Sequence, residues 1–305
     1  MNRGVVYGLA AYILWGFFPL YWKQLHAVSS GEVVAHRIVW SLGFLALLHI
    51  VNRKWVWLAT AVRSPRVAGI FLCSSFLLGI NWGLYIWAIQ ANRIVDASLG
   101  YFITPLINIL LGLIVLKEKL RTFQVFAVIL AAVGVMYFTI QFGSLPFIAL
   151  ALAFSFGLYG LIRKKAPLNS LDGLSLETLI LFLPAFSYLV FMHSSGKGHW
   201  AHDPLMNTML LTLSGAVTAI PLLLFGASAR RVTLASVGIM QYLSPSLQFL
   251  IGVLIYHEPF SFQRLIGFII IWIASLLYTI DSVRFSLKIG QATIQNSAEK
   301  ILNPQ

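Results

Sequence analysis

Long apolar runs separated by short charged connections are the feature that most constrains the fold of this 305-residue chain. A helix that crosses the roughly 30 Å hydrocarbon core of a bilayer needs about 20 apolar residues. Only 10% of the residues are charged, whereas soluble domains carry about 25%. We therefore predict an all-α polytopic membrane protein of ten transmembrane helices. The candidate spans lie near residues 4–22, 33–51, 68–90, 95–116, 122–140, 145–162, 175–192, 206–229, 233–256 and 263–281.

The distribution of Lys and Arg predicts how these spans are oriented. Positive residues gather in cytoplasmic connections. With both termini inside, sixteen Lys and Arg residues lie in the cytoplasm, four lie outside, and Arg37 lies within the second span. The sixteen are Arg3, Arg53, Lys54, Arg63, Arg66, Lys117, Lys119, Arg121, Arg163, Lys164, Lys165, Arg230, Arg231, Arg284, Lys288 and Lys300. We expect cytoplasmic N- and C-termini.

The same pattern of residues occurs in the fourth and ninth spans. From Pro105 and from Pro245, an amide follows after three residues, a glycine after seven and a glutamate after thirteen. In the first and sixth spans, Gly16 and Gly157 each precede a lysine by seven residues. Five spans per half is an odd number, so the second half enters the membrane from the other side. We expect two inverted five-helix repeats at 4–140 and 145–281, followed by a polar tail at 284–305 that is loose or a surface helix.

Several motifs together resemble the RarD proteins of the EamA family, in the drug/metabolite transporter superfamily. These motifs extend from about residue 4 to residue 281. One departure from the family pattern is His257, at a position where family members more often have a glycine. The resemblance rests on these residues: Ala10-Ala11-Tyr12, Trp15-Gly16, His36-Arg37, Trp40-Ser41, Asn81-Trp82, Ala97 to Phe102 with Pro105 and Asn108, Gly143 to Pro146, Ala153 to Phe156, Arg163 to Lys165, and Gln241-Tyr242 with Pro245. The resemblance implies a bacterial inner-membrane protein; family members are described as chloramphenicol-sensitive proteins or predicted permeases.

The nine acidic residues all fall at or near predicted helix ends. Proton-driven carriers often hold a carboxylate at membrane depth, and no such residue is evident in this sequence. A passive carrier or exchanger therefore fits slightly better than a buried acid relay. Glu118 and Glu258 end matching spans, and we interpret them as helix caps or ion-pair partners.

His36 and Arg37 are the most suggestive pair in the second span. Adjacent residues of a helix point about 100° apart, so one can face a cavity while the other faces the interface. Arg37 could attract an anionic or carboxylate group of a substrate through its paired donors. Alternatively, it snorkels to the lipid headgroups or pairs with Glu32.

Asn81 and Trp82 lie in the middle of the third span, between Gly79 and Gly83. Asn81 could hydrogen-bond a substrate near the midplane, with Trp82 as an aromatic wall. The alternative is that Asn81 joins helices, because a buried amide in lipid must find a partner, and that the glycines permit close helix packing.

The fourth and ninth spans give the remaining site candidates. A proline within a helix frees a backbone carbonyl, which must then face protein or a wet cavity. Interrupted spans at matching positions of two halves indicate a transport site, although a purely structural kink would leave the same pattern. We expect helix breaks at Pro105 and Pro245 and candidate substrate contacts from Tyr101, Asn108, Gln241, Tyr242 and Gln248.

These features together favour a secondary transporter for a small organic solute, metabolite or drug-like, working by alternating access at a midplane site between the repeats. An intramembrane enzyme or a non-transporting receptor or scaffold is the alternative. We expect no catalytic residues, no metal and no cofactor. The expected partners are a small-molecule substrate and the lipid bilayer, with no nucleic acid, and the protein is expected to be a monomer or loose dimer.

Overall fold

The regular structure of the described chain is helical throughout. The computed structural model describes residues 2–52, 55, 58–59, 63–90, 94–141, 147–201, 204–256 and 262–302. Within these residues a helix lies along each of the ten predicted spans, which confirms the predicted all-α class. The helices of the first half are α1 (Arg3–Gly16), α2 (Phe18–Trp22), α3 (Ser30–Asn52), α5 (Pro65–Gln90), α6 (Ile94–Ile114) and α7 (Thr122–Gln141), with a 3-10 turn, η1 (Lys23–Leu25).

The second half repeats this series of helices. It contains α8 (Phe147–Lys165), α9 (Ser170–Ser194), α10 (Leu205–Ala229), α11 (Leu234–Gln241), α12 (Leu243–Leu254) and α13 (Phe262–Leu302). Polar side chains fix several helix starts: Asn2 accepts from the N–H of Gly4, and Asn169 accepts from that of Asp172. Such caps satisfy backbone donors that have no partner within the helix. Of the described helices, seven are long and apolar enough to cross a membrane.

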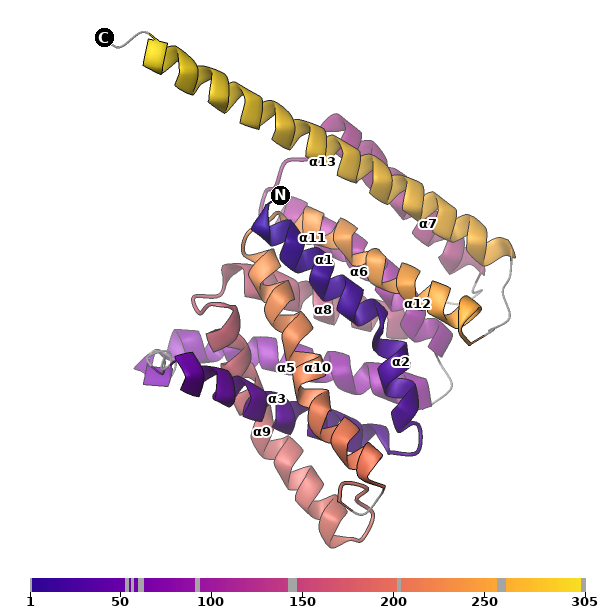
Figure 1. The fold of residues 1–305 in the computed structure, drawn as a ribbon. Coiled ribbons are helices and arrows are strands. Elements are labelled where there is room, and N and C mark those ends of the chain that lie inside the picture. The colour runs from indigo at the N-terminus through magenta and orange to yellow at the C-terminus, as the bar shows by residue number, and fades with distance from the viewer. Residues whose placement is uncertain are drawn as a thin grey trace. The chain divides into compact units, whose positions relative to one another are not determined.

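The helices fall into two compact units, shown in Figure 1. The larger unit comprises Met1–Glu118 and Ser144–Phe260, and the smaller one comprises Lys119–Gly143 and Ser261–Gln305. In the larger unit, α3 packs against α9 and α10, α6 packs against α8 and α11, and α1 packs against α10. An aromatic cluster of Tyr12, Tyr159 and Phe225 lies in its core, where the rings of Tyr159 and Phe225 stack 6.0 Å apart.

The smaller unit consists of α7 lying along α13. A Cβ atom on Gly134 would come within 2.8 Å of Ile271, so this glycine lets the two helices approach closely. Arg121 forms an ion pair with Asp281 at 2.5 Å. The predicted tail continues α13 as helix to Leu302.

The structure corrects the expected helix break at Pro105. Helix α6 runs through this proline without interruption. One missing backbone hydrogen bond does not end a helix that is packed between other helices, and hydroxyl side chains can donate hydrogen bonds to nearby backbone carbonyls. Here the Thr104 hydroxyl donates to the carbonyl of Gly100 at 2.6 Å, next to the Tyr101 carbonyl, which Pro105 leaves without its helical donor. Helix α11 packs closely on the same stretch, because a Cβ on Gly238 would lie 2.6 Å from the Pro105 oxygen.

The ninth span is interrupted, although not at its proline. Helix α11 ends at Gln241 and α12 begins at Leu243, so the break lies at Tyr242, three residues before Pro245. Because Pro245 has no N–H, the carbonyl of Gln241 lacks its normal helical donor. The effect of the proline therefore appears one turn upstream of the position that the sequence predicted.

Candidate functional site

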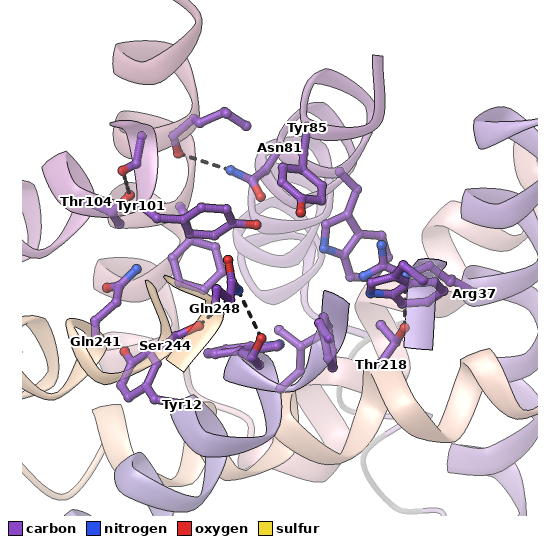
Figure 2. A pocket seen from close by; sticks show the side chains of 18 residues that line it. Tyr12, Arg37, Asn81, Tyr85, Tyr101, Thr104, Thr218, Gln241, Ser244 and Gln248 are labelled. Atoms are coloured by element: carbon purple, nitrogen blue, oxygen red, sulfur yellow. Dashed lines mark hydrogen bonds between the residues drawn. The ribbon is translucent and has the colours of Figure 1, made fainter. Parts of the chain in front are cut away.

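A cavity of about 80 Å³ lies within the larger unit and is lined by both halves of the chain (Figure 2). Eight of the eighteen lining residues are aromatic, and amides and hydroxyls lie between them at several points. From the first half come Tyr12, Trp15, Phe18, Trp22, Arg37, Asn81, Trp82, Tyr85, Gly100, Tyr101 and Thr104; from the second come Leu152, Phe156, Thr218, Leu222, Gln241, Ser244 and Gln248. Apolar pockets with a few convergent polar groups are the usual form of small-molecule sites.

Two interrupted helices meet at this cavity. The first span breaks at Phe17, between α1 and α2, and Pro19 supplies no N–H to the carbonyl of Trp15. The side-chain amide of Gln248 donates to that freed carbonyl at 3.0 Å. This break was not among the sequence expectations, although a proline three residues after Gly16 is a visible signal for it.

Arg37 is held inside the protein. Only 6% of it is exposed, and its Nε donates to Thr218 Oγ1 at 2.9 Å. Its guanidinium carbon lies 4.7 Å from the ring centroid of Trp22 and 4.9 Å from that of Trp82. Such cation–π contacts favour a desolvated guanidinium. The alternative of a side chain that snorkels to headgroups is therefore wrong.

Glu32 is not the partner of Arg37, which removes the second alternative. Its carboxylate is buried and accepts from the backbone N–H of His199 at 2.6 Å, while Oε2 lies 2.7 Å from Nδ1 of the same residue. His36 is close to this group, with Nε2 3.9 Å from Glu32, and accepts from Trp40 Nε1 at 3.2 Å. The structure does not place His36 on the cavity wall.

Asn81 joins two helices and also lies on the cavity wall. Its amide nitrogen donates to the Leu152 carbonyl and to Ser155 Oγ, each at 3.0 Å, and so joins α5 to α8. It also lines the cavity, as does Trp82. The neighbouring glycines differ: a Cβ on Gly79 would touch Leu181 at 3.3 Å, whereas Gly83 has open space around it.

The candidates on α6, α11 and α12 divide between the cavity wall and the core. Tyr101, Gln241 and Gln248 line the cavity. Asn108 is fully buried behind it and donates to Gln241 Oε1 at 2.9 Å, which orients the amide that reaches the cavity. Tyr242 and the two prolines also lie away from the wall.

Several lining residues were not among the sequence candidates, and helical spacing could have identified some of them. Tyr85 lies four residues after Asn81, and Ser244 lies four residues before Gln248, so each shares a helix face with a candidate. Figure 2 shows Tyr85 and Tyr101 close together, and their rings lie 5.5 Å apart. Thr218 had no such signal, because its role depends on contact with Arg37 of another helix.

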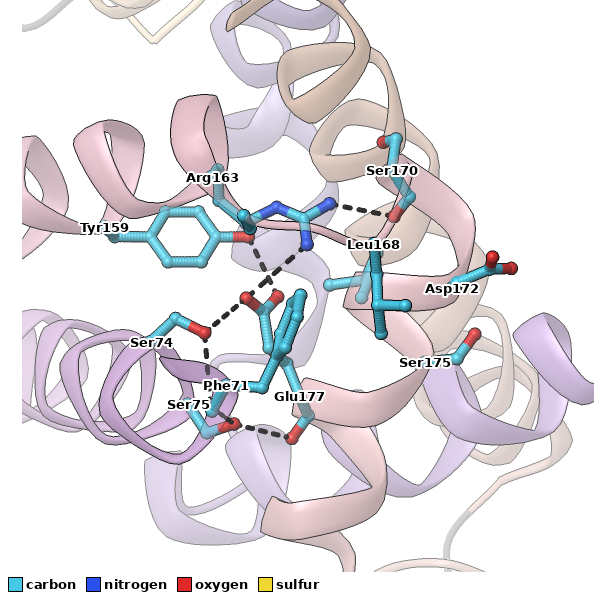
Figure 3. A network of polar contacts seen from close by, with 12 residues as sticks. Phe71, Ser74, Ser75, Tyr159, Arg163, Leu168, Ser170, Asp172, Ser175 and Glu177 are labelled. Atoms are coloured by element: carbon cyan, nitrogen blue, oxygen red, sulfur yellow. Dashed lines mark hydrogen bonds and ion pairs between the residues drawn. The ribbon is translucent and has the colours of Figure 1, made fainter. Parts of the chain in front are cut away.

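A second polar cluster overturns the expectation that all acidic residues lie at helix ends (Figure 3). Glu177 lies inside α9 and is 0% exposed. It accepts from Ser74 Oγ at 2.6 Å and from the Tyr159 hydroxyl at 3.2 Å, and its carboxylate lies 3.6 Å from Arg163 Nη1. Arg163, counted in the sequence as part of a charged connection, is 1% exposed within α8. The α9 helix begins five residues before the predicted span, which is why Glu177 falls inside it.

The interpretation of Glu118 as a cap and ion-pair partner is confirmed. Its carboxylate accepts from the N–H groups of Leu234 and Ala235, at 2.8 and 3.1 Å, at the start of α11. Lys164 Nζ lies 3.6 Å from the same carboxylate. An anion at a helix N-terminus is stabilised by the helix dipole. The matching residue, Glu258, lies outside the described residues.

Comparison with known proteins assigns the family. The model of the EamA-like transporter family matches residues 2–140 and again residues 144–280. The chain belongs to this family. The two matches confirm the two-repeat architecture that the proline–amide–glycine–glutamate spacing indicated. Together with the long apolar helices, they show a multi-pass membrane protein.

Full-length relatives support the same assignment. The chain is 41% identical to Protein RarD of Streptomyces exfoliatus over 301 residues, which cover 99% of this chain and 95% of the relative. It is 43% identical to the uncharacterized transporter YojE of Bacillus subtilis, covering 93% of this chain and 96% of the relative. A solved crystal structure matches 92% of this chain and 98% of its own with a TM-score of 0.69 at 17% identity, which shows a shared fold.

Proposed function

We propose that the protein is a secondary transporter of the bacterial inner membrane that moves a small organic solute, a metabolite or a drug-like compound. The observation that carries the proposal is the cavity in the larger unit, because both repeats supply its walls. In transporters built from repeats, the substrate site lies near the midplane at the repeat interface. Alternating access would expose this cavity first to one side of the membrane and then to the other.

The interrupted helices support the same function. The breaks at Phe17 and Tyr242 occur in spans that contribute wall residues, and Gln248 connects the two spans at the Trp15 carbonyl. Each break leaves a backbone carbonyl without its regular helical donor, and such groups are tolerated at membrane depth where they are buried in protein or line a water-filled cavity. Such positions can change conformation at a lower cost than continuous helix.

The positions of the carboxylates bear on whether transport is coupled to a proton gradient. None of the described residues that line the cavity is acidic, and Glu177 is held by Arg163, Ser74 and Tyr159. We therefore propose facilitated transport or exchange that does not require a proton gradient.

The test is a flux and binding screen on purified protein in liposomes, run with and without a pH gradient. The panel contains amino acids, nucleosides, short carboxylates and amphipathic drugs, with ligand-dependent thermal stabilisation as a second readout. We expect at least one solute to give both flux and stabilisation. A panel without flux or stabilisation would contradict transport, and flux that requires the gradient would contradict the proposed coupling.

Substitutions test whether transport depends on the cavity. Gln248→Leu removes the amide that bonds the Trp15 carbonyl, and we expect it to reduce flux while folded yield is retained. Asn52→Leu is the control, because Asn52 is an exposed amide at the end of α3. Equal flux in both variants would remove this cavity from the mechanism.

A further inference from the structure

Arg37 differs from every other described residue that lines the cavity because it carries a charge. A buried cation in a membrane protein needs a partner, since it has given up its water. In the described part of the chain Arg37 forms no ion pair, and its one hydrogen bond is from Nε to Thr218. The Glu32 carboxylate, five residues away, is engaged by His199 instead.

The two terminal nitrogens of Arg37 are thus the unmatched part of the group. A guanidinium offers five N–H donors, and within the described residues only the Nε donor has a protein acceptor. The phenols of Tyr85 and Tyr101 line the same cavity, but they are neutral groups. Trp22 and Trp82 contact it by cation–π interaction and leave the charge uncompensated.

From this geometry we infer that the cavity binds a compact organic monoanion, a carboxylate with a short apolar body, with Arg37 as the group that binds its anionic end. The inference rests on the proposed transport function and adds the substrate class. Paired guanidinium donors match the two oxygens of a carboxylate. The aromatic wall, including Trp15 and Phe156, suits the apolar body.

The size and the charge of the cavity further restrict the class of substrate that it can bind. A cavity of about 150 Å³ takes up a benzene ring, and this one measures about 80 Å³, so a body of a few carbon atoms fits this conformation. An ammonium group would meet Arg37 and no described carboxylate on the wall. The site should therefore prefer a simple carboxylate to the amino acid of the same length.

The test uses small probes that differ in charge and are similar in size. Thermal stabilisation and titration calorimetry compare propionate with propionamide, propylamine and alanine, and sodium chloride serves as the inorganic anion. Flux into liposomes uses ethanesulfonate, because it stays ionised and does not cross lipid as a neutral acid. We expect binding of propionate and flux of ethanesulfonate, and weaker or no response to the others.

Substitutions distinguish a loss of ligand binding from a loss of folded structure. Charge-assisted hydrogen bonds are stronger than neutral ones, so we expect Arg37→Gln to weaken propionate binding about tenfold or more. Arg284→Gln makes the same chemical change at an exposed position and should leave binding unchanged. If Arg37→Gln proves poorly folded, Arg37→Lys retains the charge without the planar fork, and we expect it to bind propionate more weakly than wild type does.

The outcomes also distinguish this inference from the proposed function. Binding and flux of neutral or zwitterionic solutes with none of the anions would overturn the substrate class and leave transport intact. Chloride that competes as well as propionate would overturn the organic part of the ligand. Unchanged propionate binding in Arg37→Gln would overturn the role of this residue. A protein that transports nothing from either panel would contradict both proposals.

Discussion

Arg163 and Glu177 show how a single buried pair determines the packing around it. The two side chains come from adjacent helices, α8 and α9, and both are almost fully buried. Arg163 Nη2 also donates to the Ser170 carbonyl at 2.9 Å, and Gly173 leaves the space that the guanidinium occupies. A buried ion pair contributes little net stability, whereas removing one partner leaves an uncompensated charge.

Glu177→Gln should therefore destabilise the protein strongly. Breaking a buried pair costs about 3–5 kcal/mol, and we expect the thermal unfolding midpoint in detergent to fall by roughly 5–10 °C. The double substitution Arg163→Met with Glu177→Met removes both charges and should unfold at a higher temperature than Glu177→Gln alone. If the single variant unfolds at the wild-type temperature, the pair does not hold α8 to α9.

This pair also marks the limit of what the sequence could reveal at the scale of residues. Hydropathy located the helices, and motif spacing identified several wall residues. Burial of Glu177 depends on Arg163, fourteen positions away and on another helix, and no periodicity along one helix records such a contact. Arg37 could be singled out because a lone cation in an apolar run is visible, whereas its partner Thr218 could not.

At the scale of elements, α3 and α10 approach more closely than side chains on both would allow. A Cβ on Gly215 would overlap the backbone of Trp40 and Ser41, and the Ser41 hydroxyl donates to the Gly215 carbonyl at 3.0 Å. Small residues at such crossings let helices pack in lipid, where no hydrophobic effect drives them together. This contact places Arg37 and Thr218, one turn away on each helix, within bonding distance.

Gly215→Ala should separate these helices. Because the added methyl meets backbone rather than a flexible side chain, we expect the unfolding midpoint to fall by about 5 °C or more. Gly83→Ala is the matched control, since a Cβ there meets nothing within 4 Å and alanine favours helix over glycine by about 0.5–1 kcal/mol. Equal midpoints for the two variants would argue against the close crossing.

The break between α1 and α2 leads to a different prediction. Pro19→Ala restores an N–H that can donate to the Trp15 carbonyl and compete with Gln248. We expect a small rise in the unfolding midpoint, because the restored N–H adds a hydrogen bond while Pro19 lies in the first turn of α2, where proline is tolerated, together with slower liposome flux of whichever solute the wild type transports. Pro167→Ala, in the exposed connection between α8 and α9, should change neither. Unaltered flux in Pro19→Ala would mean that this break is structural only.

For the whole molecule, the repeat was the most informative sequence signal. The matched spacing from Pro105 and Pro245 predicted two related halves, and the family matches follow those halves. The compact units do not follow them, since α7 and α13 come from different halves and pack together. The sequence repeat shows that the chain consists of two related halves. Contacts between helices depend on side-chain complementarity, which the spacing of motif residues along the sequence does not encode.

The orientation of the molecule is the final prediction. With Arg163 buried rather than in a connection, fifteen Lys and Arg residues still favour the cytoplasmic side against four, so the positive-inside bias predicts cytoplasmic termini. Cys73 is the only cysteine in the sequence, and Cys73→Ser provides a clean background. In that background, Ser195→Cys, at the exposed end of α9, should react with a membrane-impermeant maleimide in intact cells. Ser297→Cys, in the C-terminal tail, should react only after permeabilisation, and the reverse pattern would mean that the chain is inserted the other way.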